Sequence, residues 1–393
     1  MASTGKAANK NLSARVAANL ARRIAAADTL SLGLSGGRDS VALFDLLLEL
    51  RASLTFTLRC IHVHHGLSVH AADWAGFCGR LCAEHGVPLV VERVVVDRDD
   101  ARGIEAAARA ARHAVFTRQP GWLVTAHHRD DQAETLLLQL LRGAGPKGLA
   151  AMAQTQGRSL RPLLDASRDD IDAYVRARGL RWVDDDSNSD NRHRRNAWRE
   201  MVLPALRALF PQAGATLARA ARLQGEAAGL LDELAELDAA GAVAGDRLDC
   251  AALAALAPAR ARNLLRWFVA RRGGRMPQQV QLDQALTQLL GARDDARVRA
   301  ALGDGSLARW RGGAYWLPEL PEWDGEIALD AAPTGLPLGA SGVALTLSTS
   351  VGEGMSQARL AGAVVRLRRG GESLRRRPGG PLRSLSAPSG SGT

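Results

Sequence analysis

Short apolar segments alternate with amphipathic helical segments along residues 21–205. The segments that are typical of strands cover 29–34, 55–63, 88–96 and 121–126. The segments with helical spacing of apolar residues cover about 39–52, 70–86, 103–119 and 130–142. This alternation predicts an α/β fold, a doubly wound parallel sheet with helices on both faces. Such sheets bind ligands at the carboxyl ends of their strands.

Polar clusters follow three of these four strands. The hexapeptide SGGRDS follows the first strand, HHG follows the second and HHRDD follows the fourth. Because the carboxyl ends of parallel strands meet at one edge of a sheet, we expect these clusters to form one site.

The hexapeptide after the first strand favours an anion-binding turn. Gly36 and Gly37 permit close backbone approach, and the N-terminus of the following helix offers unpaired amides. Ser35 and Ser40 add hydroxyl donors. The alternative is a plain strand-to-helix turn with Asp39 or Ser40 as the N-cap, and the full hexapeptide after an apolar strand favours the anion. The turn lacks the lysine of a Walker-type P-loop, so the phosphate it binds undergoes different chemistry.

The chain is too long for one core, and its charge favours a polyanionic partner. It has 393 residues, a net charge of +10 and 46% hydrophobic residues, which indicates two or three globular domains and nucleic acid as a partner. From about Leu206 the sequence is rich in Ala, Leu and Arg with helical periodicity. The predicted parts are a flexible tail (1–20), an α/β domain (21–205), an all-helical domain (206–305), a small strand-containing region (306–385) and a disordered tail (386–393).

The cysteines and the apolar segments exclude several classes of protein. Cys60, Cys78, Cys82 and Cys250 form no C-x-x-C pair, and a zinc or iron–sulfur site would need further soft ligands, so core packing is favoured. A reducing cytoplasm fits this pattern. No segment is typical of a secretory signal, and none approaches the ~20 apolar residues of a membrane span.

The motifs resemble a known family. S-G-G-x-D-S resembles the PP-loop of the ATP pyrophosphatase superfamily, whose fold is adenine nucleotide alpha hydrolase-like. The resemblance to the tRNA(Ile)-lysidine synthetase family runs from about 29 to 210 and weakens in the helical region. Four further stretches carry it: GIEAAARAARHAVF (103–116), TAHHRDDQAETLLLQLLRGAGPKGLAAM (125–152), RPLL (161–164) and WVDDDSNSDNRHRRNAWREMVLP (182–204).

This resemblance implies a two-step reaction on RNA. Such enzymes use ATP, with Mg²⁺, to adenylate C2 of the wobble cytidine in a CAU-anticodon isoleucine tRNA. Free L-lysine then displaces AMP and gives lysidine. The PP-loop holds the β- and γ-phosphates, which leave together as pyrophosphate. Because the bond breaks at the α-phosphorus, the lysine that a Walker-type P-loop uses in γ-phosphoryl transfer is not required.

The resemblance also implies the nucleotide-binding residues. They are Ser35, Gly36, Gly37, Arg38, Asp39, Ser40, His62, His64 and His127, with Asp39 also catalytic and a candidate neighbour of Mg²⁺. His62 and His64 share one side of an extended strand. A metal site at these histidines would lack acidic ligands at local spacing.

Three acids and two arginines are the remaining catalytic candidates. Asp130, Asp131 and Glu134 are suited to binding and deprotonating the lysine ammonium or to holding metal, and Asp130 and Glu134 share a helical face. Helix capping is the alternative role for the two aspartates. Arg109 and Arg112, three residues apart, would neutralise charge at the α-phosphate. A solvated basic helix face is the alternative.

Candidate RNA contacts are spread along the chain. They are Arg142, Arg195, Asn196, Arg199, Arg368, Arg369 and Arg375. DDDSN (184–188) is typical of a turn rather than of a Mg²⁺ site, and Asp186 stands where the family often has proline. The C-terminal family pattern begins at RRGGESLRRRPGGPLRSL and then stops, so the last domain is expected to be truncated. A homodimer is an open expectation.

Three other functions compete with this one. A tRNA thiolation enzyme would need a catalytic cysteine or C-x-x-C pairs. A ligase or amidotransferase for a small molecule would not explain the arginine-rich helical region. An RNA-binding protein with impaired activity would show a decayed PP-loop, but all six motif residues stand.

Overall fold

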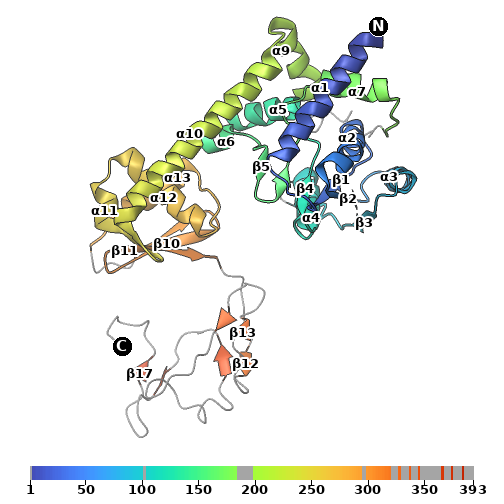
Figure 1. Ribbon diagram of the computed structural model, residues 1–393. Helices are drawn as coiled ribbons and strands as arrows, with labels where there is room; N and C mark the ends of the chain where they lie inside the picture. The colour runs from blue at the N-terminus through green and yellow to red at the C-terminus, as the bar shows by residue number, and fades with distance from the viewer. Residues whose placement is uncertain are drawn as a thin grey trace. The chain divides into compact units, whose positions relative to one another are not determined.

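The computed structural model divides the chain into two compact units, residues 1–233 and 234–393 (Figure 1). We describe each unit by itself. The structure describes residues 2–100, 103–183, 198–293 and 298–319, and the short strands 326–328, 336–337, 344–345, 364–366, 373–374 and 383–384.

The first unit is built on a six-stranded sheet with strand order β3-β2-β1-β4-β6-β5. Its strands are β1 (Thr29–Gly33), β2 (Thr57–His64), β3 (Leu89–Arg93), β4 (Trp122–Val124), β5 (Thr155–Gln156) and β6 (Ser159–Leu160). All neighbouring strands are parallel except β5, which pairs antiparallel with β6. The chain order reverses between β1 and β4, which is the point where sheets of this kind bind ligands. The parallel sheet is confirmed, whereas β5 and β6 are too short to leave a sequence pattern.

The predicted helices of this unit are confirmed with small shifts at their ends. They are α2 (Arg38–Leu54), α3 (Ala71–Glu84), α4 (Ile104–Thr117), α5 (Arg129–Leu140) and α7 (Arg168–Arg178), with a single turn α6 (Pro146–Leu149) between the last two. Ser167 caps α7 in a reciprocal capping box, because Asp170 N–H donates to Ser167 Oγ (3.0 Å) and Ser167 N–H donates to Asp170 Oδ2 (2.9 Å).

The prediction of a flexible tail over residues 1–20 is wrong. The helix α1 (Ala2–Ala21) occupies this range, and Leu12, Val16 and Leu20 are buried in the core with Leu30 and Phe44. These three residues are spaced four apart, so they lie on one helical face. Because the residues before Leu12 are mostly polar, the sequence analysis did not recognise this apolar helix face.

The second unit combines helices with an antiparallel sheet. The helix α10 (Ala213–Ala242) begins in the first unit and ends in the second, where α11 (Cys250–Ala255), α12 (Pro258–Arg271) and α13 (Gln279–Gly291) follow. The sheet has strand order β7-β8-β11-β10-β9. Its strands are β7 (Val243–Ala244), β8 (Arg247–Asp249), β9 (Arg299–Leu302), β10 (Gly305–Trp310) and β11 (Gly313–Pro318).

The prediction of an all-helical domain over 206–305 is therefore wrong, and its boundary cuts through this sheet. The predicted strand-like segment 307–317 forms the hairpin β10–β11, whose outer partners β8 and β9 come from the range predicted as helical. Strands of three or four residues do not show a period distinct from that of a helix. Their pairing with a distant hairpin decides their conformation.

Parts of the sequence prediction lie outside the described residues. These parts are the segment 184–197, with DDDSN and Asp186, most of the basic C-terminal segment and the tail 386–393. Of the predicted strand at 343–350, the structure describes β14 (Ala344–Leu345), which pairs with β13 (Leu336–Pro337). Within the described parts, no helix has the length and apolar character that crossing a membrane requires.

We predict that α1 stabilises the first unit. Leu20 is 1% exposed, so Leu20→Ala should lower the free energy of unfolding by about 2–5 kcal/mol. Urea titration followed by circular dichroism measures this change. Leu141→Ala, at a leucine that is 70% exposed, is the control and should leave the midpoint nearly unchanged. Equal midpoints for wild type and Leu20→Ala would contradict the packing of α1.

Candidate functional site

The turn after β1 is held by its backbone and by its neighbours. Leu34 N–H donates to the Ile61 carbonyl oxygen (2.8 Å), which extends the sheet by one residue. Gly36 has φ +87°, and a Cβ there would lie 2.9 Å from Cγ2 of Val183 and 3.2 Å from Sγ of Cys78. Only glycine satisfies both the conformation and the space.

Two hydroxyls line the same turn. Ser35 Oγ lies 3.1 Å from Ser40 Oγ and accepts a hydrogen bond from Gly37 N–H (3.3 Å), and Ser40 Oγ donates to the Gly37 carbonyl oxygen (2.8 Å). Gly37 is the N-cap of α2, and no side chain makes a capping bond there. The alternative in which Asp39 or Ser40 is the N-cap is therefore wrong. The helix N-terminus combines amides and hydroxyls in the way that suits a phosphate.

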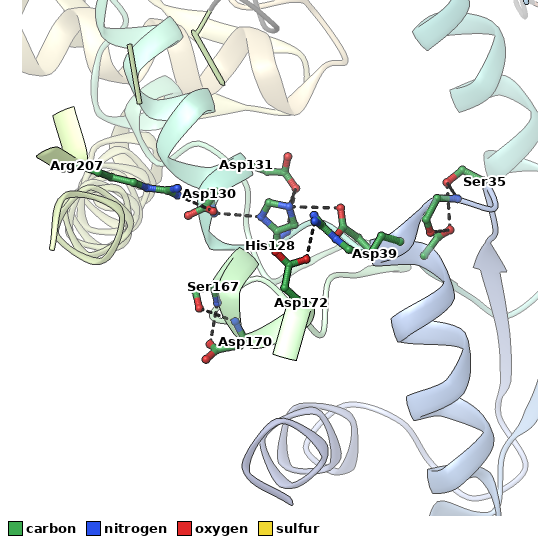
Figure 2. Close-up of polar contacts among 12 residues, drawn as sticks. Ser35, Asp39, His128, Asp130, Asp131, Ser167, Asp170, Asp172 and Arg207 are labelled. Carbon is green, nitrogen blue, oxygen red and sulfur yellow. Dashed lines mark hydrogen bonds and ion pairs between the residues drawn. The ribbon is translucent and has the colours of Figure 1, made fainter. Parts of the chain in front are cut away.

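A chain of polar contacts between acidic and basic side chains links the start of α2 to α5 and α7 (Figure 2). Arg38 donates from Nε and Nη2 to Asp39 Oδ1 (3.0 Å each), and its Nη1 lies 2.6 Å from Asp172 Oδ1. On the other side, His128 Nε2 lies 3.5 Å from Asp39 Oδ2 and 3.6 Å from Asp131 Oδ2. We call Asp172, Arg38, Asp39, His128 and Asp131 the charge chain.

The charge chain shifts the pKa of two members. Burial alone would raise the pKa of Asp39, but His128 and Arg38 outweigh burial and lower this pKa to about 2. Burial disfavours the charged imidazole of His128, but the carboxylates of Asp131 and Asp39 outweigh burial and raise the pKa of His128. Asp39 is therefore ionised throughout the neutral range.

His128 also caps α5, a role that the sequence analysis missed. Its Nδ1 accepts a hydrogen bond from Asp130 N–H (3.2 Å), and Asp131 Oδ2 accepts one from His128 N–H (3.0 Å). This bond requires the neutral ring, whose proton then lies on Nε2, which faces Asp39 and Asp131. Protonation of the ring, which the two carboxylates favour, gives up the capping bond at Nδ1. The motif HHRDD held the signal, because a polar residue just before two acids at a helix start is typical of a cap.

The three predicted acids are all buried on α5. Asp130 is 5% exposed, Asp131 7% and Glu134 1%. Asp130 Oδ2 lies 2.7 Å from Nη2 of Arg207 on α9 (Leu203–Leu209), so Asp130 is ion-paired (Figure 2). Asp131 therefore has the capping role that was the alternative to catalysis, whereas Asp130 forms an ion pair. Burying an ionised carboxylate is costly unless it is paired, and the Arg207 guanidinium offsets this cost for Asp130.

The predicted histidines lie at the strand ends, with different surroundings. His62 is buried, and its Nδ1 lies 2.9 Å from the carbonyl oxygen of Leu34, so the ring supports the turn. Burial lowers the pKa of His62 and favours the neutral ring. His64, the last residue of β2, is half-buried, and His127 Nδ1 lies 2.9 Å from Thr125 Oγ1. Their predicted contact with a nucleotide stays a prediction.

The two predicted arginines of α4 are exposed and lie near strand ends. Burial lowers the pKa of Arg161, which follows β6, and the positive charge of Arg109 lowers it further. Burial likewise lowers the pKa of His65, which follows β2, and Arg112 adds to this effect. Both guanidiniums of α4 therefore act on groups at the carboxyl edge of the sheet.

The structure leaves most predicted RNA contacts unplaced. Arg142 is exposed just beyond α5, and Arg199 lies in the π-helix η2 (Trp198–Val202), where its side chain is not described. The other five predicted contacts, four arginines and one asparagine, lie outside the described residues: Arg195, Asn196, Arg368, Arg369 and Arg375.

Clustered metal ligands and the cysteines were the remaining candidates for chemistry. Among them, no group of three or more His, Cys, Asp or Glu side chains could hold a metal ion. All four cysteines are buried thiols, as core packing predicts.

We predict that His128→Ala changes how stability depends on pH. The lowered pKa of Asp39 stabilises the fold above its ordinary value of 3.8, and this contribution is lost as the pH falls toward about 2. Without His128 the folded-state pKa of Asp39 rises, so the loss of stability below about pH 4 should become shallower. The lost cap should also cost about 1 kcal/mol at neutral pH. Urea midpoints at pH 6, 4 and 3 measure both effects, with His127→Ala as the control. If stability falls as steeply between pH 4 and pH 3 in His128→Ala as in the wild type, the link between His128 and Asp39 is contradicted.

Comparison with known proteins matches two domain models and several curated relatives to the chain. A PP-loop domain model matches residues 8–206, and a TilS substrate-binding domain model matches residues 248–315. The chain is similar to the tRNA(Ile)-lysidine synthases of an Azoarcus species (44% identity) and Nitrosomonas europaea (39% identity), in each case over 93% of this chain and 82% of that protein. It is also similar to that of Ralstonia nicotianae, with 42% identity over 91% of this chain and 82% of that protein.

Solved structures show a weaker similarity. The U34-tRNA thiolase NcsA from Methanococcus maripaludis, with its [4Fe-4S] cluster, superposes with a TM-score of 0.48 and 18% identity, over 56% of this chain and 80% of that chain. The matched domain models, together with the extent and identity of the sequence matches, establish that the chain belongs to the tRNA(Ile)-lysidine synthase family.

Proposed function

We propose that this chain converts the wobble cytidine of a CAU-anticodon isoleucine tRNA into lysidine, using ATP and free L-lysine. One observation carries the proposal in a chain of this family. The charge chain joins the phosphate-binding turn at α2 to the buried acids of α5. A site for adenylation and a site for an amine nucleophile are therefore adjacent.

In the first step, the C2 oxygen of cytidine attacks the α-phosphorus of ATP. The oxygen–phosphorus bond forms, the bond from the α-phosphorus to the bridging oxygen breaks, and pyrophosphate leaves. We assign the β- and γ-phosphates to the amides at the start of α2 and to the hydroxyls of Ser35 and Ser40. Arg109 and Arg112, at the same edge of the sheet, would stabilise the charge that develops at the α-phosphate.

Mg²⁺ belongs to this proposal as the partner of the ATP phosphates. It is a hard cation that takes oxygen ligands and often binds through one or two carboxylates and the substrate phosphates. Asp39 fits this role by its position and charge, because it is ionised beside the phosphate-binding turn. The charge chain would fix its carboxylate.

In the second step, the amine of lysine attacks C2. The carbon–nitrogen bond forms, the bond from C2 to the adenylate oxygen breaks, and AMP leaves with that oxygen. The ammonium group must first lose a proton, and a carboxylate can both bind it and accept the proton. We assign the lysine ammonium to Asp131 and Glu134, which are buried carboxylates on α5 beside the charge chain, and leave Asp130 in its ion pair with Arg207.

The other functions fit the structure less well. Thiolation would need an accessible cysteine, and all four thiols are buried. An inactive RNA-binding protein would not need the complete turn and the charge chain. The predicted RNA contacts and the homodimer stay predictions, and light scattering during gel filtration would test the dimer.

The direct test is incorporation of lysine into RNA. Purified protein with ATP, Mg²⁺ and radiolabelled lysine should label a CAU-anticodon isoleucine tRNA transcript. A methionine tRNA with the same anticodon should stay unlabelled. Labelling requires both adenylation and attack by lysine. A protein that never labels the isoleucine transcript therefore does not form lysidine.

Two substitutions should separate the two steps. Asp39→Ala should abolish release of pyrophosphate and labelling, while retention of tRNA on a filter stays nearly unchanged. Glu134→Gln should retain adenylation of the tRNA and raise the KM for lysine at least about tenfold, since a charged hydrogen bond to the ammonium is lost. Pyrophosphate release and lysine labelling, measured separately, decide this. Loss of both activities in Glu134→Gln would contradict the assignment to lysine.

A further inference from the structure

The guanidinium of Arg38 is engaged by carboxylates on two sides. Its Nε and Nη2 donate to Oδ1 of Asp39 (3.0 Å each), and its Nη1 lies 2.6 Å from Oδ1 of Asp172 on α7 (Figure 2). The side chain of Arg38 is 15% exposed. The sequence analysis places Arg38 among the nucleotide-binding residues. Two carboxylates more than balance its charge, however, so a phosphate brought to this guanidinium would meet net negative charge.

The two oxygens of the Asp39 carboxylate have different surroundings. Oδ1 accepts two hydrogen bonds from Arg38, which fill its two lone-pair positions. Oδ2 lies 3.5 Å from Nε2 of His128, which is longer than an ordinary N–H···O bond. The contacts with Arg38 therefore fix the orientation of the carboxylate and leave Oδ2 as the oxygen that can accept a cation.

The helix α7 is held against α2 by a second set of contacts. Tyr174 Oη donates to Asp45 Oδ2 (2.6 Å), and Arg178 donates from Nε to Asp45 Oδ2 (2.8 Å) and from Nη2 to Asp45 Oδ1 (3.2 Å). These contacts join the same two helices without Asp172. The carboxylate of Asp172 is therefore carried by a helix that has its own anchor, and it gives Arg38 a fixed point of attachment outside α2.

The charge of this group suits a divalent cation. Asp39, Arg38 and Asp172 together leave one negative charge, because two carboxylates face one guanidinium. Without Asp172, Arg38 would neutralise Asp39, and a neutral pair attracts a cation more weakly. Mg²⁺ takes oxygen ligands and often binds through one or two carboxylates together with substrate phosphates. The Oδ2 atom of Asp39, beside the phosphate-binding turn, fits this kind of ligand set.

We propose that Arg38 and Asp172 are positioning residues that act on Asp39, and that the side chain of Arg38 does not bind the nucleotide. Asp172 holds the guanidinium of Arg38, Arg38 holds Oδ1 of Asp39, and Oδ2 is thereby presented to the Mg²⁺ that accompanies ATP. Partners of this kind orient metal-binding carboxylates in proteins. The pairing of Asp39 with Mg²⁺ rests on the proposed function, whereas the action of Asp172 through Arg38 goes beyond it.

The test measures the dissociation constant of α,β-methylene-ATP by isothermal titration calorimetry, once with Mg²⁺ and once with EDTA. This analogue cannot release pyrophosphate, so binding is measured without turnover, and neither tRNA nor lysine is needed. Asp172→Asn should weaken binding in Mg²⁺ about 10-fold, the smaller end of the loss expected for an outer partner of a metal ligand. It should not weaken binding in EDTA. Asp172→Glu should restore part of the affinity in Mg²⁺.

A double variant separates positioning from charge and from direct contact. Arg38→Met/Asp172→Asn removes one charge of each sign, so the net charge of the group stays as in the wild type. Lost positioning predicts that the double variant binds as weakly as Asp172→Asn in Mg²⁺ and as well as the wild type in EDTA. An effect of charge alone predicts wild-type affinity in Mg²⁺. A direct contact between Arg38 and a phosphate predicts weaker binding in EDTA also.

Asp45→Asn is the matched control, because it loosens the same two helices without a change at Arg38. It should lower the urea midpoint at least as much as Asp172→Asn does, since Asp45 accepts hydrogen bonds from both Tyr174 and Arg178. It should bind the analogue in Mg²⁺ as the wild type does. If Asp45→Asn does not fold, Arg178→Met removes part of the same contact at an exposed arginine.

Five results would overturn the proposal. Wild-type affinity of Asp172→Asn in Mg²⁺ would do so, and so would recovery of that affinity in the double variant. An equal loss in Asp45→Asn would make the effect one of helix packing. A loss in EDTA as large as the loss in Mg²⁺ would return Arg38 to the nucleotide-binding residues. Equal binding by the wild type in Mg²⁺ and in EDTA would remove the role of Asp39 on which the proposal rests.

The outcome is distinguishable from that of the proposed function. Lysine incorporation into tRNA is measured separately from binding of the analogue. A loss of binding that is specific to Mg²⁺, in a protein that never labels the isoleucine transcript, would contradict the proposed function alone.

Discussion

The site depends on ionised carboxylates that are held at the edge of a buried sheet. An unpaired carboxylate in such a place would take up a proton or destabilise the fold. Arg38 and His128 prevent this for Asp39, whose pKa they lower, and Arg207 forms an ion pair with Asp130. Because the partners come from α2, α5 and α9, the same contacts also fix these helices relative to one another.

His128 has a double role in this arrangement. One ring nitrogen accepts the amide of Asp130 and starts α5, and the other faces Asp39 and Asp131. The neutral ring can do both at once, because one nitrogen accepts and the other donates. The position of the acids on α5 is thus coupled to the position of Asp39 beside the phosphate-binding turn, which places the two half-reactions of the proposed function next to each other.

The contacts between distant segments limited the sequence analysis. The parallel strands and the turn at Gly36 were predicted correctly, because apolar runs and a glycine with positive φ are local properties. The helix α1 was missed, since Leu12, Val16 and Leu20 become informative only with a core to pack against. The strands β8 and β9 were read as helix because their partners lie in a hairpin that comes later in the chain.

The sequence by itself determined the α/β class, the glycine turn after β1, the position of the three acids on α5 and, through its motifs, the family. Only the tertiary structure decided which groups pair: Asp130 with Arg207, and Asp39 with His128 and Arg38. It also decided that the side chain of Arg38 contacts Asp172 on α7. The physical reason is that strand order, turns and helix starts follow from local spacing, whereas charge pairing and exposure depend on distances between residues that are far apart in the chain.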